Sequence, residues 1–396
     1  MNPSSQFQGR ASGVAVPDRP VPQDDRARIA SIDILRGLVM ALMALDHARD
    51  FFGEGGFNPR DVTEPALFLT RWITHLCAPT FIFLAGLSAF LYGRGRRVAE
   101  LSRFLFIRGL WLVAIEFTVV KFAWAFDLDF SDAFTAGVIW VIGASMVALS
   151  ALVWLPRGAI AAVALAMIVG HNLLDDVRAE DLEEGAAVWH VLHQRGFAQF
   201  GDGVRVFVLY PLIPWIGVMA AGYVLGPVMA LDGDERKRVL LKLGATITIG
   251  FVLLRATNLY GDPAPWGVQD NWLATVLSFL NCGKYPPSLL YLMMTLGPAL
   301  MLLGALEQAR GSVARILAVY GQVPFFFYVV HLYLIHALAV ASGLAMTGVL
   351  SRNPEIGLNL AGVYLVWLLV LGLLYPLGLW FAGLKERGRG WWWRYL

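Results

Sequence analysis

The stretch Ser31–Phe52, SIDILRGLVMALMALDHARDFF, is long and apolar enough to form a membrane helix, yet it contains several ionisable residues. On an α-helix Arg36 and His47 lie about 20° apart, and Asp33 lies about 40° from His47. The helical rise separates Arg36 from His47 by roughly 16 Å along the axis. Charges within a membrane span are costly, so this polar stripe predicts a functional surface.

Asp46 and Asp50 flank His47 at the far end of this helix. They are candidates to orient its imidazole ring, since a carboxylate bonded to one ring nitrogen fixes which nitrogen carries the proton. An alternative interpretation is that Asp33 and Arg36 lie at one membrane interface, while Asp46–Asp50 is the frayed outer end of the helix.

The composition excludes an ordinary soluble domain. Of 396 residues 58% are hydrophobic and only 15% are charged, as in polytopic membrane proteins. The net charge of +2 gives no indication of nucleic-acid binding. Cys77 and Cys282 are the only cysteines, and the seven histidines include no HxxxH or HExxH spacing. We therefore expect neither a disulfide nor a metal site.

Hydropathy predicts an all-α polytopic membrane protein with about ten transmembrane helices. The segments before and after the membrane region are distinctive: residues 1–30 are polar and lack the apolar core of a cleavable signal peptide, whereas 385–396 are basic and aromatic. Residues 31–384 form the expected transmembrane domain. The expected spans are 31–52, 67–92, 102–122, 134–154, 158–174, 205–231, 237–259, 286–306, 316–346 and 356–383.

Loop charges predict the orientation of these spans. Every even-numbered loop is basic, for example Arg94–Arg103 and Arg236–Arg238, while the opposite loops carry acidic residues such as Asp61 and Asp129. Because cytoplasmic loops of membrane proteins are enriched in Lys and Arg, both termini are expected in the cytoplasm. The expected location is the inner (plasma) membrane, as a multi-pass protein.

Further polar residues are predicted to converge with His47 in the outer half of the membrane. His75 lies four residues after Arg71 and shares its helix face. Gly321 and Pro324 interrupt the ninth span, which carries His331 and His336. These two histidines point about 140° apart, so at most one is expected to face the same cavity as His47.

Two outer segments are candidates for substrate binding. Lys284 and Tyr285 lie in the NCGKYPPS turn, which either holds an anionic or sugar group or serves only as a tight membrane-entry turn. Tyr210 precedes prolines expected to kink the sixth span and so to line a cavity. Arg108 lies nearer the cytoplasm, and Glu116 is either a structural charge or part of a donor path.

Several of these segments together resemble a known family. SIDILRG, MALDHARDFF, FLTRWITHLCAPTFIFLAG, YPLIPWIGVMAAGY, GKYPPSLLYLMMTLGPA and GQVPFFFYVVHLYLIHAL resemble the bacterial DUF1624 family, which is similar to the catalytic domain of heparan-alpha-glucosaminide N-acetyltransferase. The first helix also looks like that of the acyltransferase-3 group, through Asp33, Arg36, Gly37 and His47. In the lysosomal branch the implicated histidine lies in the following loop, but Gly53–Ala66 contains none.

The resemblance implies an acyltransferase that takes an acetyl or other acyl group from cytoplasmic acyl-CoA. The acceptor would be a glycan or amino sugar on the periplasmic side, modified by O- or N-acylation. It implies His47, or alternatively His75, as the base, with Arg71 stabilising the oxyanion or positioning the acceptor. Asp33, Arg36 and Arg108 would bind coenzyme A, and no permanently bound cofactor is expected. A homo-oligomer is compatible with this interpretation.

A competing interpretation is a proton-coupled transporter or glycolipid flippase. Ionisable residues near the midplane and helices broken by proline are also typical of such carriers. The sequence shows no convincing internal repeat, which favours the enzyme. Consumption of labelled acetyl-CoA with acylation of an acceptor would discriminate between the two classes.

Overall fold

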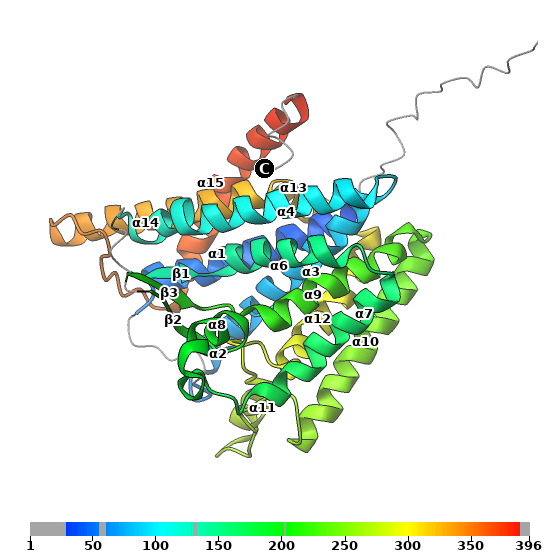
Figure 1. Cartoon of the computed structure of the whole chain (residues 1–396). Coiled ribbons are helices and arrows are strands. Elements are labelled where there is room, and N and C mark those ends of the chain that lie inside the picture. Colours follow the sequence, from blue (N-terminus) through cyan, green and yellow to red (C-terminus); the bar gives the residue numbers. More distant parts are fainter. Residues whose placement is uncertain (1–28, 55–60, 128, 130–132, 202, 389–396) are drawn as a thin grey trace, which may run out of the picture.

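The computed structural model describes residues 29–54, 61–127, 129, 133–201 and 203–388, and within these it is a bundle of helices with a small sheet at one end (Figure 1). Residues 1–28 of the predicted polar segment 1–30 therefore lie outside the described residues. Residues 389–396 of the predicted basic and aromatic tail also lie outside them. The tail boundary at 385 falls inside a helix that continues to Arg387.

The helices that run along the bundle are mostly uninterrupted segments of apolar sequence. Pro298 and Pro376 lie inside two of them. Their bounds are α1 (Ala30–Phe52), α2 (Pro65–Thr74), α3 (Cys77–Gly93), α4 (Val98–Ile115), α6 (Val138–Leu152), α7 (Arg157–Gly170), α9 (Leu212–Leu225), α10 (Gly233–Thr257), α12 (Leu289–Ala305), α13 (Ser312–Gln322), α14 (Pro324–Thr347) and α15 (Leu360–Arg387).

Shorter elements connect these helices. A π-helical turn, Glu116–Val120, continues α4 into α5 (Lys121–Ala125), and 3-10 turns extend α7, α9 and α12. The remaining helices are α8 (Ala186–Leu192) and α11 (Trp272–Leu280), and the strands are β1 (Phe134–Ala136), β2 (Gly196–Phe200) and β3 (Val204–Val208).

The strands form one sheet in the order β1-β3-β2. β1 pairs parallel with β3, aligning Phe134 with Val206, and β2 pairs antiparallel with β3, aligning Gly196 with Val208. We call the end of the bundle that carries this sheet the sheet end. The opposite end carries Arg94, Arg96 and Arg97 in the turn between α3 and α4, and we call it the basic end.

Helix α1 lies in the interior and organises the bundle, packing against α3, α13, α14 and α15. Glycines permit the closest of these contacts. A Cβ atom at Gly37 would lie 1.8 Å from the carbonyl oxygen of Leu317, and one at Gly321 would lie 1.8 Å from that of Asp33. The backbones of α1 and α13 therefore touch where Asp33 and Arg36 are located, as do those of α3 and α9 around Gly86.

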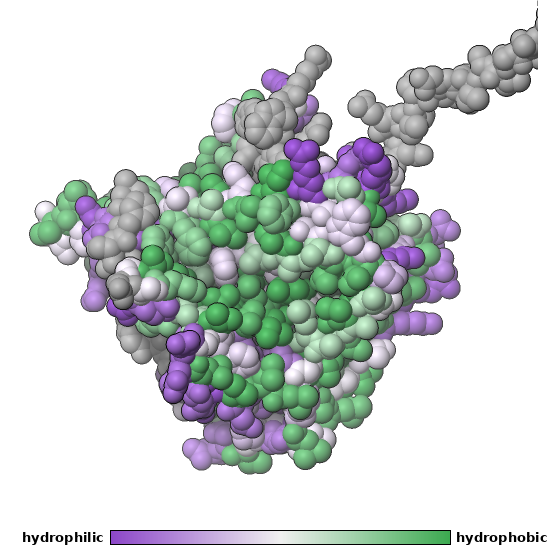
Figure 2. Space-filling model, viewed as in Figure 1, coloured by the Kyte–Doolittle hydropathy of each residue, from purple (hydrophilic) through white to green (hydrophobic). Residues whose placement is uncertain are grey.

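The surface and the helix lengths identify an α-helical membrane protein. Figure 2 shows apolar residues covering the middle of the visible face, with hydrophilic residues gathered toward its edges. Within the described part of the chain, seven helical segments are long and apolar enough to cross a membrane. They are Pro65–Gly93, Arg157–Leu174, Leu212–Ala230, Gly233–Thr257, Leu289–Gln308, Pro324–Thr347 and Leu360–Arg387.

The structure corrects the expected all-α architecture at the sixth span. The segment expected to begin this span at 205 instead forms strand β3, and α9 begins only at Leu212. The predicted proline kink is also wrong, because Pro211 caps α9 and Pro214 lies in its first turn, where a missing N–H leaves no helical bond broken. The interruption predicted at Gly321 and Pro324 is confirmed, since α13 ends at Gln322 and α14 begins at Pro324.

Candidate functional site

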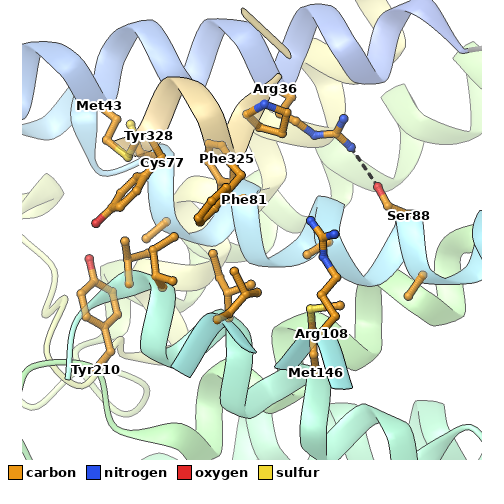
Figure 3. A pocket seen from close by; sticks show the side chains of 18 of the residues that line it. Arg36, Met43, Cys77, Phe81, Ser88, Arg108, Met146, Tyr210, Phe325 and Tyr328 are labelled. Carbon is orange, nitrogen blue, oxygen red and sulfur yellow. Dashed lines mark hydrogen bonds between the residues drawn. The ribbon is translucent and has the colours of Figure 1, made fainter. Parts of the chain in front are cut away.

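One cavity of about 450 Å³ runs through the bundle beside α1. Its walls come from α1, α3, α4, α6 and the start of α14, together with Tyr210 and Lys284 from two connecting segments. In Figure 3 Tyr210 and Tyr328 point toward each other across one end, while Arg36 and Arg108 lie near the other. The cavity thus joins a cationic region to the region of His47, which also lines it.

The ring of His47 is hydrogen-bonded to a second histidine. Its Nδ1 lies 2.7 Å from Nε2 of His331, and Nδ1 of His331 lies 2.9 Å from the carbonyl oxygen of Phe327. A carbonyl only accepts, so Nδ1 of a neutral His331 carries the proton and its Nε2 accepts from Nδ1–H of His47. This order leaves the lone pair of His47 on Nε2, as a general base requires.

Aromatic rings fix the position of this histidine pair. Trp124 contacts the His47 ring edge-on at a centroid distance of 5.0 Å, and Tyr328 does so at 6.4 Å. His331 is fully buried, and its ring plane lies only 10° from that of His47, as suits a hydrogen bond between the edges of the two rings. The orienting group for His47 is therefore His331 rather than the carboxylate of Asp46 or Asp50 that the sequence analysis proposed.

Asp46 instead belongs to a partly buried ionic cluster beside the histidine. Its Oδ2 accepts a hydrogen bond from Arg71, and its Oδ1 lies 3.0 Å from Arg49. Arg49 also pairs with Asp50 at 2.7 Å, close to the end of α1. The cluster joins α1 to α2 and places one carboxylate, Asp46, on the cavity wall.

Arg36, Arg108 and Lys385 supply positive charge to the cavity toward the basic end. Arg36 donates to Oδ1 of Asp33 at 3.2 Å, to the carbonyl oxygen of Gly321 at 3.2 Å and to Ser88 at 2.8 Å, as the dashed line in Figure 3 shows for Ser88. These bonds hold the guanidinium in a defined orientation across α1, α3 and α13. Such a fixed cation is suited to binding a phosphate.

The segment 281–288 brings Lys284 and Tyr285 to the opposite end of the cavity. Asp262 holds this segment by accepting from the backbone N–H of Gly283 at 2.7 Å and from the hydroxyl of Ser288 at 2.6 Å. Lys284 lines the cavity, and its ammonium lies 5.1 Å from the Tyr285 ring.

Tyr285 lies in a positively charged environment. Its hydroxyl is 3.4 Å from that of Tyr210, and Arg195 lies over its ring at 5.6 Å. Burial raises the pKa of the Tyr285 phenol, but the charges of Lys284 and Arg71 outweigh burial and hold that pKa below its ordinary value. The same charges would favour an anionic or oxygen-rich ligand.

Some predicted site residues lie elsewhere. His75 lies in a turn between α2 and α3, where its backbone carbonyl accepts from the hydroxyl of Tyr291 at 2.9 Å, and it does not line the cavity. His336 is buried between the carbonyl oxygens of Ala123 and Arg352, at 2.8 and 2.6 Å. At most one of His331 and His336 was expected to face the cavity of His47; neither lines it, and His331 is instead connected to it through the hydrogen bond to His47.

Glu116 was expected to be either a structural charge or part of a donor path, and its contacts are those of a structural charge. Its carboxylate accepts from the backbone N–H groups of Gly137 and Trp140, at 3.2 and 3.0 Å. These donors belong to the beginning of α6, where a helix has unsatisfied N–H groups and favours negative charge. Glu116 therefore caps α6 and does not line the cavity.

Several residues that shape the site were not predicted from the sequence. Trp124, Tyr328 and Ser88 occur in apolar segments in which nothing distinguishes them from residues that face lipid. Asp262 and Arg255 were also missed; Arg255 is 1% exposed and donates to four backbone carbonyls around the segment 281–288. A buried arginine at the end of an apolar helix was a usable signal, because such a charge needs partners.

A comparison with known families identifies a match that covers α1 and much of the cavity wall. The family model described as heparan-alpha-glucosaminide N-acetyltransferase, catalytic, matches residues 28–255, which is more than half of the chain. That range includes α1 with Arg36 and His47, and both α3 and α4, which line the cavity. None of the individually curated proteins matches the chain. The chain belongs to the family of the heparan-alpha-glucosaminide N-acetyltransferase catalytic domain.

Proposed function

We propose that this protein transfers an acyl group from acyl-CoA, taken up at the basic end, to a glycan or amino-sugar acceptor at the sheet end. One observation supports this proposal above all others. A single cavity carries Arg36, Arg108 and Lys385 toward one end and Asp46, His47 and Lys284 toward the other. Family membership indicates a transmembrane acetyltransferase, so acetyl-CoA is the first donor to test.

The donor would bind with its phosphates near Arg36 and Arg108. Charge-assisted hydrogen bonds from arginine to phosphate are strong and directional, and Arg36 is already held in place by Asp33 and Gly321. The thioester arm would then extend through the apolar middle of the cavity, between Phe81 and Phe325, toward His47. Burial of this arm excludes water, which would otherwise hydrolyse the thioester.

The transfer step follows from the hydrogen bonds of His47. Its Nε2 takes the proton from the acceptor hydroxyl or amine as the acceptor oxygen or nitrogen attacks the thioester carbonyl. The carbon–sulfur bond then breaks, and the coenzyme A thiolate leaves with the proton that His47 returns. Lys284 and Tyr210 lie on the cavity wall and are placed to stabilise the oxyanion or to hold the acceptor.

The same proposal includes an orientation in the inner membrane. Ten spans with both termini in the cytoplasm would put the basic end inside, where acyl-CoA is available, and the sheet end outside. The arginines in the turn between α3 and α4 support this orientation, because cytoplasmic loops are enriched in positive charge.

Sealed proteoliposomes test this function. Labelled acetyl-CoA is added to the face that displays the basic end, and amino-sugar or oligosaccharide acceptors are enclosed on the other side. If the protein is an acyltransferase, labelled acceptor should form inside and free coenzyme A outside, in equal amounts. Movement of an unmodified solute without consumption of acetyl-CoA would instead identify a carrier.

A further inference from the structure

A second cluster of chemically active side chains lies at the sheet end. His171 follows α7, Asp175 comes four residues later, and His193 follows α8. One ligand atom from each of the three residues lies within 4.8 Å of the others. None of them lines the cavity that contains His47. The cluster is therefore separate from the proposed acyltransfer site.

The two histidines are buried without the hydrogen bonds that buried imidazoles normally make. His171 is 1% exposed and His193 is 2% exposed. Among the described residues, neither Nδ1 nor Nε2 of His171 has a hydrogen-bond partner, and Nδ1 of His193 has none. A buried polar atom without a partner costs about 1–3 kcal/mol, so three such atoms at one place need an explanation.

The carboxylate of the cluster is already held for binding. Oδ2 of Asp175 accepts from the side-chain amide of Asn172 at 2.8 Å, whereas its Oδ1 lies 3.4 Å from Nε2 of His193. Asn172 is itself fixed, because its Oδ1 accepts from the backbone N–H of Leu289 at 2.9 Å. Carboxylate ligands of metals are commonly oriented by such outer hydrogen bonds.

We propose that His171, Asp175 and His193 bind a zinc ion, with a water molecule as the fourth ligand. Two imidazole nitrogens and one carboxylate oxygen form a donor set that suits zinc, whereas magnesium and calcium prefer oxygen ligands throughout. Zinc bonds of about 2.0–2.2 Å bring ligand atoms to roughly 3.4 Å from one another. The most widely separated ligand atoms, which lie within 4.8 Å of one another, would therefore approach by up to about 1.4 Å on binding, which small side-chain rotations provide.

Three protein ligands and a water molecule are the arrangement of catalytic rather than of structural zinc sites, but this ion would lie outside the acyltransfer cavity and would act there by joining elements of the fold. It would connect the end of α7 to the end of α8, from which the chain enters β2 and then β3. β3 leads directly to Tyr210, which lines the cavity, and Arg195 beside β2 lies over Tyr285. The ion would thus fix the sheet and the wall of the cavity at the sheet end without taking part in acyl transfer. The HxxxH and HExxH spacings considered in the sequence analysis do not describe this ligand set, which is H-x-x-x-D and a distant histidine.

Metal content measured on the full-length protein tests the proposal without reference to enzyme activity. The purified protein in detergent is incubated with zinc sulfate and freed of unbound metal, and the zinc per chain is determined by mass spectrometry. Cobalt substituted for zinc provides a second readout, since four-coordinate Co²⁺ absorbs visible light. We expect one zinc per chain and a tetrahedral cobalt spectrum for the wild type.

Three variants locate the ion. His171→Gln and Asp175→Asn each remove one ligand and should weaken zinc affinity by more than about 100-fold, because even outer hydrogen-bond partners contribute about 10- to 100-fold. His190→Gln is the matched control, as His190 lies on α8 near the cluster but bonds to the carbonyl of Gln194. It should bind zinc as the wild type does.

Two results would overturn the proposal. One is a wild-type protein that takes up no zinc and gives no tetrahedral cobalt spectrum. The other is zinc uptake that is equal in the wild type, His171→Gln and Asp175→Asn. If a ligand variant fails to fold, the cobalt spectrum of the wild type, with and without a chelator, still decides whether the site exists.

Discussion

At the scale of single residues, the site depends on which hydrogen bonds each side chain makes rather than on its position in the sequence. His47 and His75 could not be ranked from the sequence, because both lie near an arginine or a carboxylate at similar predicted depth. The structure distinguishes them. His47 lines the cavity and is oriented by His331, while His75, at the junction of α2 and α3, does not line it.

Breaking the ion pair between Asp46 and Arg71 is expected to lower the stability of the protein strongly. Asp46→Asn leaves Arg71 and Arg49 without their shared carboxylate, and breaking a buried pair costs about 3–5 kcal/mol. Thermal unfolding in detergent should therefore show a lowered melting temperature. The double variant Asp46→Asn with Arg71→Met should recover part of the loss. If the stability that the double variant loses relative to the wild type equals the sum of the losses of the two single variants, the two residues do not act as a pair.

Replacing Arg36 is expected to weaken donor binding. Arg36→Ala should weaken acetyl-CoA binding by about 10- to 150-fold, since a charge-assisted hydrogen bond contributes about 1.5–3 kcal/mol. Calorimetry on purified protein gives the affinity. Arg315→Ala is the control, because Arg315 is exposed near the basic end and does not line the cavity. Equal affinities for the two variants would remove Arg36 from donor binding.

At the scale of elements, hydropathy located the long helices but not the segments around them. Continuous apolar runs predicted α10, α12 and α15 to within a few residues, because lipid-facing and core-facing side chains are both apolar. The sheet was missed. Strand β3 has the sequence VRVFV, which hydropathy joined to the apolar α9, and its pairing with β1 depends on residues about seventy positions away.

The contact between α1 and α13 predicts that glycine is required there. Gly37→Ala places a methyl group against the carbonyl of Leu317 and should destabilise the protein by about 1–3 kcal/mol or more. Gly372→Ala in α15 is the control, because no atom lies near its Cβ position. That change should be neutral or stabilise by about 0.5–1 kcal/mol, since alanine favours the helix. Similar melting temperatures for the two variants would contradict the close contact.

At the scale of the whole molecule, the arrangement of two hydrophilic ends around an apolar middle determines what the cavity can connect. The sequence predicted this arrangement from loop charges, and it predicted that Arg36 and His47 share one face. Both residues line the cavity. Lys284 was a candidate from its turn sequence, but Ser88 and Tyr328 could not be predicted, because they reach the cavity through packing between helices that are distant in sequence.

Reporter fusions test the orientation. Fusions at Asp61, Asp129 and Pro263 should behave as periplasmic, because all three positions lie in loops on the side expected outside. A fusion in the turn after Gly93 should behave as cytoplasmic. A cytoplasmic signal from any of the first three would overturn the proposed sidedness.

We propose that His47, reached through the cavity, is the base for acyl transfer. The most direct test compares acetyl transfer by His47→Gln and His75→Gln in the sealed proteoliposomes, with acetyl-CoA binding measured on the same preparations. We predict that His47→Gln binds acetyl-CoA normally but transfers acetyl groups about 10²- to 10⁴-fold more slowly, whereas His75→Gln stays within a few-fold of the wild type. Near-normal transfer by His47→Gln would show that His47 is not the base.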